Sequence, residues 1–277
     1  AAANGQGRGG TDMSVLLEAQ GVGKYFGGLK AVDGVDMAVR KGDIFGIIGP
    51  NGAGKTTFFN ICSGFYSPTH GTIRLRGERI SGMSPERIAR RGMTRTFQNI
   101  QLFKFMSVLE NVKIGFHSQT RTRLMDAILR NRTYRQDEAF VVEQGTRILD
   151  KVGLAQYRDT PAGNLPYGLQ RKVEIARALA MKTEILLLDE PAAGMNPLET
   201  QSLLQLIKDL SAEGHTLVVI EHDMHFVMNA CNRILVLNFG QKICEGAPNE
   251  VKSDPRVQEA YFGKGLLTAA GRAVCHA

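Results

Sequence analysis

The chain has 277 residues, with a hydrophobic fraction of 43%, a charged fraction of 22% and a formal net charge of +7. These values are typical of a globular protein with one large domain or two small ones, and no run approaches the roughly 18 apolar residues of a membrane-spanning helix. The positive charge suits either nucleic acid or an acidic membrane surface, and does not choose between them.

The two ends of the chain show no strong pattern. Residues 1–12 are small and glycine-rich and have no apolar core, so we expect a flexible leader rather than a secretory signal, with Met13 a candidate natural start. Residues 264–277 are expected to form a C-terminal tail. Four scattered cysteines without a C-x-x-C pair favour reduced thiols over a metal site.

The first part of the chain alternates predicted strands with turns. Predicted strands cover residues 15–26, 35–39, 44–48 and 72–76, followed by a short extended piece at 94–97. Ser84 and Pro85 are the expected N-cap and first residue of a short helix that ends before Gly92.

The middle of the chain contains few strand formers. Ser107 and Glu110 form an S-x-x-E capping box that predicts the start of a helix. The stretch 121–151 is expected to be rich in helix, and 171–181 is predicted to be a helix with one apolar face. We therefore expect residues 98–181, approximately, to be a mostly helical insertion in an α/β core.

The core resumes with two short apolar runs. Predicted elements are buried strands at 185–188 and 217–220, a helix between them capped by Asn196, a hairpin pairing 233–237 with 241–244, and a helix at 255–263. Runs that are apolar throughout are typical of parallel strands covered on both faces.

A nine-residue stretch, here called the phosphate loop, follows the pattern G-x-x-x-x-G-K-[ST] between the strand 44–48 and a predicted helix. Glycines allow backbone N–H groups to point at a polyphosphate, Lys55 can reach the β- and γ-phosphates, and the Thr56 hydroxyl can bind Mg²⁺. An ordinary glycine-rich turn would not need both flanks and the full pattern. The predicted nucleotide-binding residues are Gly49, Pro50, Asn51, Gly52, Ala53, Gly54, Lys55, Thr56 and Thr57.

Polar residues follow the two buried strands of the C-terminal part. Asp189 and Glu190 end one strand, so we expect them beside the phosphate loop, where one carboxylate can hold Mg²⁺ and the other can activate water. His222 ends the next strand, which favours a γ-phosphate contact over a purely structural role. The stretch Leu165–Gln170 before a predicted helix is a weaker candidate anion site, and an ordinary helix-entry loop is the commoner arrangement.

The order of these pieces resembles the ATPase subunit of ABC transporters, over about residues 16–263. The pieces are the phosphate loop, 96–98, 165–170, 185–191 and 220–223. The phosphate loop is shared by many nucleotidases, whereas the five pieces in this order are highly specific. The resemblance implies an α/β P-loop NTPase (RecA-like) core at 13–97 and 182–263, with an antiparallel β subdomain and a helical subdomain inserted at about 98–181.

The resemblance also implies roles for single residues. Phe26 is similar to the aromatic residue that stacks on adenine, and Gln98 to the glutamine that senses Mg²⁺ and γ-phosphate. Glu190 resembles the catalytic glutamate and His222 the switch histidine. Thr56, Gln98 and Asp189 are the implied Mg²⁺ ligands, and ATP and Mg²⁺ the implied substrate and cofactor.

Residues 165–170, here called the signature stretch, stand where the family's signature loop binds the ATP of a second subunit, head to tail. Gly168 and Gln170 are the residues implied to contact that nucleotide. Three positions depart from the family pattern: Pro166 replaces a serine, Tyr167 a glycine and Asn196 an aspartate. These departures affect the expected strength of catalysis at a shared site more than nucleotide binding.

Finer features resemble the ATPases of branched-chain amino acid importers, and the longer of their two ATPase subunits in particular. These features are Tyr25–Gly28, Arg95–Gln98, a long helical segment after His117, the Tyr-Gly pair of the signature stretch, Glu190–Pro197 and Asp254–Gly263. The resemblance implies a second ATPase subunit, membrane permease subunits docked near Gln98, Leu102 and Phe103, and indirectly a periplasmic solute-binding protein. It places the chain at the cytoplasmic face of the inner membrane as a peripheral protein, with no nucleic acid expected; the solute rests on analogy alone.

Two alternatives remain open from the sequence. One is the ATPase of another ABC transporter, such as a lipid or lipopolysaccharide exporter. The other is a soluble ABC protein acting on ribosomes or DNA, for which the charge of +7 is an argument. Such proteins usually carry two cassettes or a long coiled-coil insertion, whereas this chain has one phosphate loop and neither addition.

Overall fold

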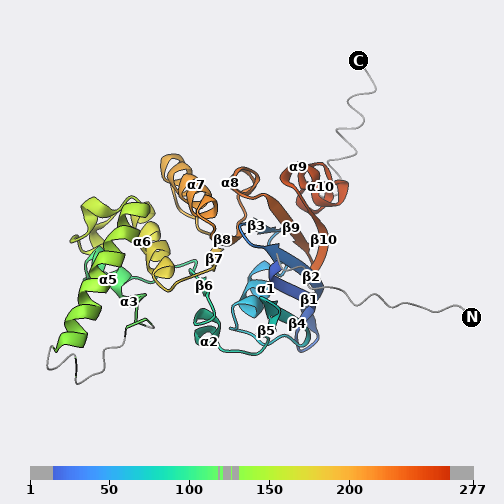
Figure 1. Ribbon diagram of the computed structural model, residues 1–277. Helices are drawn as coiled ribbons and strands as arrows, with labels where there is room; N and C mark the ends of the chain where they lie inside the picture. Colours follow the sequence, from blue (N-terminus) through green and yellow to red (C-terminus); the bar gives the residue numbers. More distant parts are fainter. Residues whose placement is uncertain (1–14, 118, 121–125, 127–130, 263–277) are drawn as a thin grey trace, which may run out of the picture.

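The computed structural model describes residues 15–117, 119, 120, 126 and 131–262 of the chain (Figure 1). The predicted leader 1–12, the tail 264–277 and most of 121–130 lie outside these residues. The strands are β1 (Val15–Phe26), β2 (Leu29–Arg40), β3 (Ile44–Ile48), β4 (His70–Leu75), β5 (Glu78–Arg79), β6 (Met93–Arg95), β7 (Ile185–Asp189), β8 (Thr216–Ile220), β9 (Arg233–Asn238) and β10 (Gln241–Gly246).

Within the described residues the strands form two sheets. One has the order β2-β1-β4-β5 with antiparallel pairs, and the other has the order β10-β9-β3-β8-β7-β6. In the second sheet β3 lies between β8 and β9 and is parallel to both. The predicted α/β class with a separate antiparallel layer is therefore confirmed, as is the β9–β10 hairpin.

The sequence predicted only the second half of β2. The strand begins at Leu29 because Phe26 pairs with Leu29 across a tight glycine turn, which extends the β1–β2 ladder by several residues. The first residues of β2 are exposed and do not alternate, so the apolar periodicity that indicates a half-buried strand is absent there.

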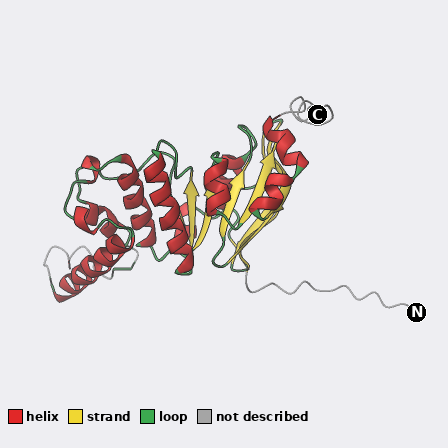
Figure 2. Ribbon diagram, turned by 90° about the horizontal axis from the view of Figure 1, so that it is seen from above, coloured by secondary structure: helices red, strands yellow, loops and turns green. Residues whose placement is uncertain are grey.

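The helices are α1 (Lys55–Cys62), α2 (Pro85–Ala89), α3 (Val108–Ile114), α5 (Arg132–Lys151), α6 (Tyr167–Leu179), α7 (Pro197–Ala212), α8 (Met224–Ala230), α9 (Pro248–Ser253) and α10 (Pro255–Phe262), with short 3₁₀ turns at Ala155–Tyr157 and Ala162–Asn164. The capping box of α3 forms as predicted, since Ser107 Oγ accepts from the Glu110 N–H and Glu110 accepts from the Ser107 N–H. Helices α3, α5 and α6 stand beside the end of the larger sheet (Figures 1 and 2).

The start of α6 was predicted wrongly. The helix begins at Tyr167 rather than near Arg171, so most of the signature stretch forms its first turn. Pro166 is the N-cap, where an extended backbone suits proline, and a glycine in the first turn is tolerated. Ser84 is the N-cap of α2 as expected, but its side chain makes no capping hydrogen bond.

Two hydrophobic clusters cover the two faces of the larger sheet. Side chains of β3 alternate between them: Phe45 and Ile47 belong to the cluster that faces the antiparallel sheet, and Ile44 and Ile48 to the cluster that extends into the helical part. Phe58 and Phe59 of α1 are fully buried, and truncating either would cost about 3–5 kcal/mol. This packing fixes the helix that starts at Lys55. Among the described helices, none is long and apolar enough to cross a membrane.

Candidate nucleotide site

The phosphate loop turns between β3 and α1 in a backbone form that requires glycine at its first and sixth residues. Gly49 has φ 153°, and a Cβ there would lie 2.1 Å from the carbonyl oxygen of Leu237. Gly54 has φ 96°, and a Cβ there would lie 2.4 Å from the carbonyl oxygen of Ala31. The loop is therefore pressed against β9 and β2, and α1 starts at Lys55, as the sequence predicted.

The Lys55 side chain folds back over its own loop. Its ammonium donates to the carbonyl oxygens of Gly49 at 2.7 Å and Pro50 at 3.0 Å, and the residue is 8% exposed. Burial lowers the pKa of Lys55, while the nearby Glu190 carboxylate opposes that shift. A polyphosphate would offer this ammonium a full negative charge in place of two neutral carbonyls.

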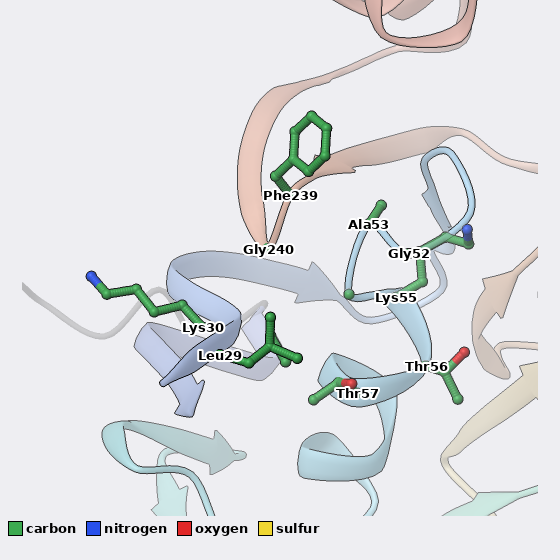
Figure 3. Close-up of a pocket in the computed structure, with 11 residues that line it drawn as sticks. Leu29, Lys30, Gly52, Ala53, Lys55, Thr56, Thr57, Phe239 and Gly240 are labelled. Atoms are coloured by element: carbon green, nitrogen blue, oxygen red, sulfur yellow. The ribbon is translucent and has the colours of Figure 1, made fainter. Parts of the chain in front are cut away.

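A cleft of about 470 Å³ opens beside the loop (Figure 3). Its lining residues are Leu29, Lys30, Ala31, Gly52, Ala53, Gly54, Lys55, Thr56, Thr57, Phe239 and Gly240. Phe239, at the turn between β9 and β10, is 85% exposed and has φ 46°. No sequence pattern indicated it as a site residue. Gly240 binds the loop directly, because its N–H donates to Ala53 O at 3.0 Å.

Phe26, the residue expected to stack on adenine, is not part of this lining. It is 44% exposed and packs edge-on against Tyr66, with ring centroids 5.5 Å apart. The Lys24 ammonium lies 5.3 Å from the centre of its ring. The role of Phe26 remains a prediction.

The three predicted catalytic residues meet at the carboxyl ends of the strands. Gln98 Nε2 donates to Glu190 Oε2 at 3.0 Å, and His222 Nδ1 lies 3.7 Å from the same oxygen. Asp189, the last residue of β7, is 6% exposed and precedes Glu190. Their convergence follows from topology, since β6, β7 and β8 are adjacent and parallel.

The expected Mg²⁺ ligands have suitable chemistry. The Thr56 hydroxyl, the Asp189 carboxylate and the Gln98 amide offer hard oxygen donors. In the part of the chain that the structure describes, no group of three or more histidine, cysteine, aspartate or glutamate side chains is arranged to hold a metal ion by itself. Mg²⁺ is usually held by a few protein oxygens together with the phosphates of the substrate, and seldom by a closed cage of protein ligands.

A buried ion pair supports Gln98, and sequence reasoning missed it. Arg171 is fully buried and donates to the backbone oxygens of Phe97 at 2.6 Å and Gln98 at 2.8 Å. Arg171 Nη1 also forms an ion pair with Glu174 Oε2 at 2.7 Å. Burial raises the pKa of Glu174, and the positive charge of Arg171 opposes that shift. Helix α6 is thereby tied to the backbone that carries Gln98.

Polar groups of the signature stretch form hydrogen bonds within their own chain. The Gly168 N–H donates to Glu199 Oε1 at 3.2 Å, and Gln170 Nε2 donates to the Leu165 carbonyl at 2.8 Å. Neither Gly168 nor Gln170 lines the cleft of Figure 3. Glu199 also caps α7 through Asn196, so one carboxylate serves the N-termini of two helices.

Comparison with known proteins decides the family. A family profile described as "ABC transporter" matches residues 32–193, more than half of the chain. The chain belongs to the ABC transporter family. It is an ATP-binding cassette, the ATPase component of a transporter, and a second profile, "Branched-chain amino acid ATP-binding cassette transporter", matches its residues 241–266.

Relatives of this cassette agree with that assignment. It is 43% identical to the high-affinity branched-chain amino acid transport ATP-binding protein BraF of Pseudomonas aeruginosa over 90% of this chain and 98% of the relative. It is 42% identical to the corresponding LivG protein of Escherichia coli K12, with the same coverage.

Solved structures agree with the observed fold. A nucleotide-free ATP-binding cassette from an ABC transporter superposes with a TM-score of 0.78 at 35% identity, covering 90% of this chain and 100% of that one. A cassette in an ADP conformation gives the same TM-score at 34% identity, covering 90% and 99%. The resemblance and the fold class inferred from the sequence are both confirmed.

Proposed function

We propose that this cassette is the ATP-hydrolysing subunit of an importer of branched-chain, hydrophobic amino acids. The observation on which the proposal depends is the meeting of Gln98, Glu190 and His222, with the Glu190 carboxylate near enough to Lys55 of the phosphate loop to act on its pKa. The names of the relatives and the profile match at 241–266 support this solute over a lipid exporter or a ribosome- or DNA-acting protein.

In this proposal each group at the site has one task. Lys55 and the backbone amides of the phosphate loop bind the β- and γ-phosphates, and Thr56, Asp189 and Gln98 hold Mg²⁺, which neutralises phosphate charge when bound. Glu190 accepts a proton from the attacking water. Gln98 donates a hydrogen bond to the Glu190 carboxylate and thereby orients that carboxylate. His222 contacts the γ-phosphate from the next strand.

A second ATPase subunit completes the site. Gly168 and Gln170 would face the nucleotide of the partner subunit, head to tail, and the Gly168 N–H must first leave Glu199. Because Pro166 has no hydroxyl, the contact with γ-phosphate depends on backbone N–H groups and the helix N-terminus. Both a homodimer and a heterodimer fit this arrangement.

Permease subunits dock where large apolar side chains reach the surface after Gln98. Phe103 is 54% exposed and Phe105, two residues on, is 100% exposed, and apolar side chains exposed close together favour a contact with another protein. The cassette would then act as a peripheral protein at the cytoplasmic face of the membrane, serving a periplasmic solute-binding protein only indirectly.

Co-purification from detergent-solubilised membranes tests the proposed function. Permeases of the amino acid importer type among the co-purified proteins support the proposal, and exporter permeases or ribosomes contradict it.

Nucleotide binding is tested by changing Lys55 to Ala. We expect ATP affinity to fall by at least about a hundredfold, since a charge-assisted contact with phosphate is lost from a buried position. Isothermal titration calorimetry measures it, with the exposed Lys41→Ala as a matched control that keeps normal affinity. Normal ATP binding by Lys55→Ala would refute the role of the phosphate loop.

A further inference from the structure

Arg95, three residues before Gln98, makes contacts that the proposed mechanism does not use. Its Nη2 lies 2.5 Å from Asp189 Oδ2, and both side chains are 8% exposed. Its Nη1 donates to Asn60 Oδ1 at 2.6 Å and to Ser63 Oγ at 2.9 Å. One buried guanidinium thus joins the expected metal ligand at the tip of β7 to the end of α1.

The same guanidinium lies among three aromatic rings. Its central carbon is 4.9 Å from the ring centre of Phe59, 5.4 Å from that of Phe65 and 5.7 Å from that of Phe97. Phe59 is buried, whereas Phe65 is 47% and Phe97 37% exposed, and these two rings meet edge-on at 5.8 Å. Phe97 adjoins Gln98, so this exposed pair belongs to the surface expected to face the permease.

Asp189 therefore has two possible cationic partners. In the metal-free protein Arg95 compensates its buried charge, which would otherwise be costly. A divalent cation at Asp189 competes for that carboxylate and repels the guanidinium beside it. Arg95 Nε is buried without a hydrogen-bond partner among the described residues, so movement of the guanidinium breaks no bond at that atom. The bonds of Nη1 to Asn60 and Ser63 would lengthen and limit the movement to a small shift.

We propose that Arg95 is a positioning residue that transmits metal occupancy at Asp189 to the surface pair Phe65–Phe97. The proposal rests on the proposed function, because it requires Mg²⁺ and nucleotide at this site. Metal binding weakens the Arg95–Asp189 pair and shifts the guanidinium against the two rings, which changes the surface that a permease segment contacts. By thermodynamic linkage, a permease segment docked on the rings changes the affinity for metal by the same factor by which bound metal changes the affinity for that segment.

The first test measures metal affinity without catalysis. Mn²⁺ is titrated into the ADP-loaded protein and free Mn²⁺ is counted by electron paramagnetic resonance, for the native chain, Arg95→Gln, Arg95→Lys and the exposed control Arg90→Gln. We expect Arg95→Gln to bind Mn²⁺ about tenfold more tightly, because a competing charge has gone. Arg95→Lys and Arg90→Gln should stay within about twofold of the native chain.

Unchanged or weaker Mn²⁺ binding by Arg95→Gln would overturn the proposal, since a residue that merely braces Asp189 predicts weaker binding. If Arg95→Gln does not fold, Arg95→Lys together with the ring signal below decides the matter. If the native chain itself shows no ADP-dependent Mn²⁺ binding, the proposed function fails too. If the native chain binds Mn²⁺ in the presence of ADP and Arg95→Gln binds it equally well, the proposal for Arg95 fails while the proposed function is retained.

The second test follows the rings. The chain contains no tryptophan, so Phe65→Trp introduces a single reporter. We expect its emission to shift when Mg²⁺ is added to the ADP-loaded protein, and the shift to be lost when Arg95→Gln or Arg95→Lys is added, because neither presents a planar guanidinium. An equal shift in all three proteins, or none in the Phe65→Trp chain, contradicts transmission through Arg95.

Discussion

Glu190 occupies a left-handed backbone conformation, with φ 44°, that residues with side chains seldom adopt. Strain of this kind costs on the order of 1–3 kcal/mol and persists only where the surroundings enforce it. Here the Glu190 N–H donates to the Ile220 carbonyl at 2.9 Å. The strained turn directs the carboxylate toward Gln98 and His222.

Replacement of Glu190 by Gln tests its role as the base. The amide keeps the size and the contact with Gln98 but accepts no proton from water, so we expect ATP turnover to fall by about 10²–10⁴-fold. ATP affinity should stay within a few fold of normal. Phosphate release and nucleotide binding are measured on the same preparation, and undiminished turnover would count against Glu190.

The lowered pKa of Lys55 predicts a pH dependence of binding. Phosphate binds the charged lysine, and burial makes the nucleotide-free protein release this proton at a lower pH than an ordinary lysine with a pKa of 10.5. Binding must then take up a proton, so affinity falls as pH rises through that lowered pKa. Calorimetry in buffers of different ionisation enthalpy should detect proton uptake in the alkaline range; its absence there would contradict the shift.

At the scale of single residues, the sequence predicted the site side chains that follow strands. It did not predict the buried arginines that hold those side chains or their backbone in place. Asp189, Glu190 and His222 follow apolar runs, and parallel strands bring such ends together, so their meeting could be expected. Arg95 and Arg171 act on residues more than 70 positions away in sequence. No local pattern marks an arginine for such a contact.

Helix α6 holds the Gln98 backbone through the buried pair Arg171–Glu174. Removing one partner leaves the other charge buried and unpaired, so we expect Arg171→Met to lower the free energy of unfolding by about 3–5 kcal/mol. The double change to Met at both positions should be less destabilising than this single one. Urea unfolding measures both, and a double variant less stable than Arg171→Met would contradict the view that an unpaired, buried Glu174 carboxylate causes the loss of stability.

Among the elements, the sequence located long or strongly patterned segments best. The parallel strands and α7 were predicted because continuous apolar runs and a proline-containing cap are local features. Helices α8 and α9 were missed because they span only seven and six residues, too few for a helical period to emerge. The start of α6 was misplaced because a Pro-Tyr-Gly sequence resembles a loop.

For the molecule as a whole, nucleotide should act as a stabilising ligand. The phosphate loop follows β3 of the larger sheet and lies against β9 of that sheet and β2 of the antiparallel one, so binding is coupled to global unfolding. At a hundred times its Kd, ADP adds about 2.7 kcal/mol, which should raise Tm by roughly 5–10 °C for a chain of this size. Scanning calorimetry tests it; Lys55→Ala should show no such rise, and an unchanged native Tm would exclude the coupling.

The position of β3 has a consequence for how the cassette is made. Its two neighbours, β8 and β9, and the Gly240 turn that braces the phosphate loop all come from residues 216–240. A nascent chain emerging from the ribosome therefore presents β3 with both edges open until most of the protein has been translated. The ability to bind ATP is gained late in synthesis, and truncated translation products should be recognised by chaperones rather than compete for cellular nucleotide.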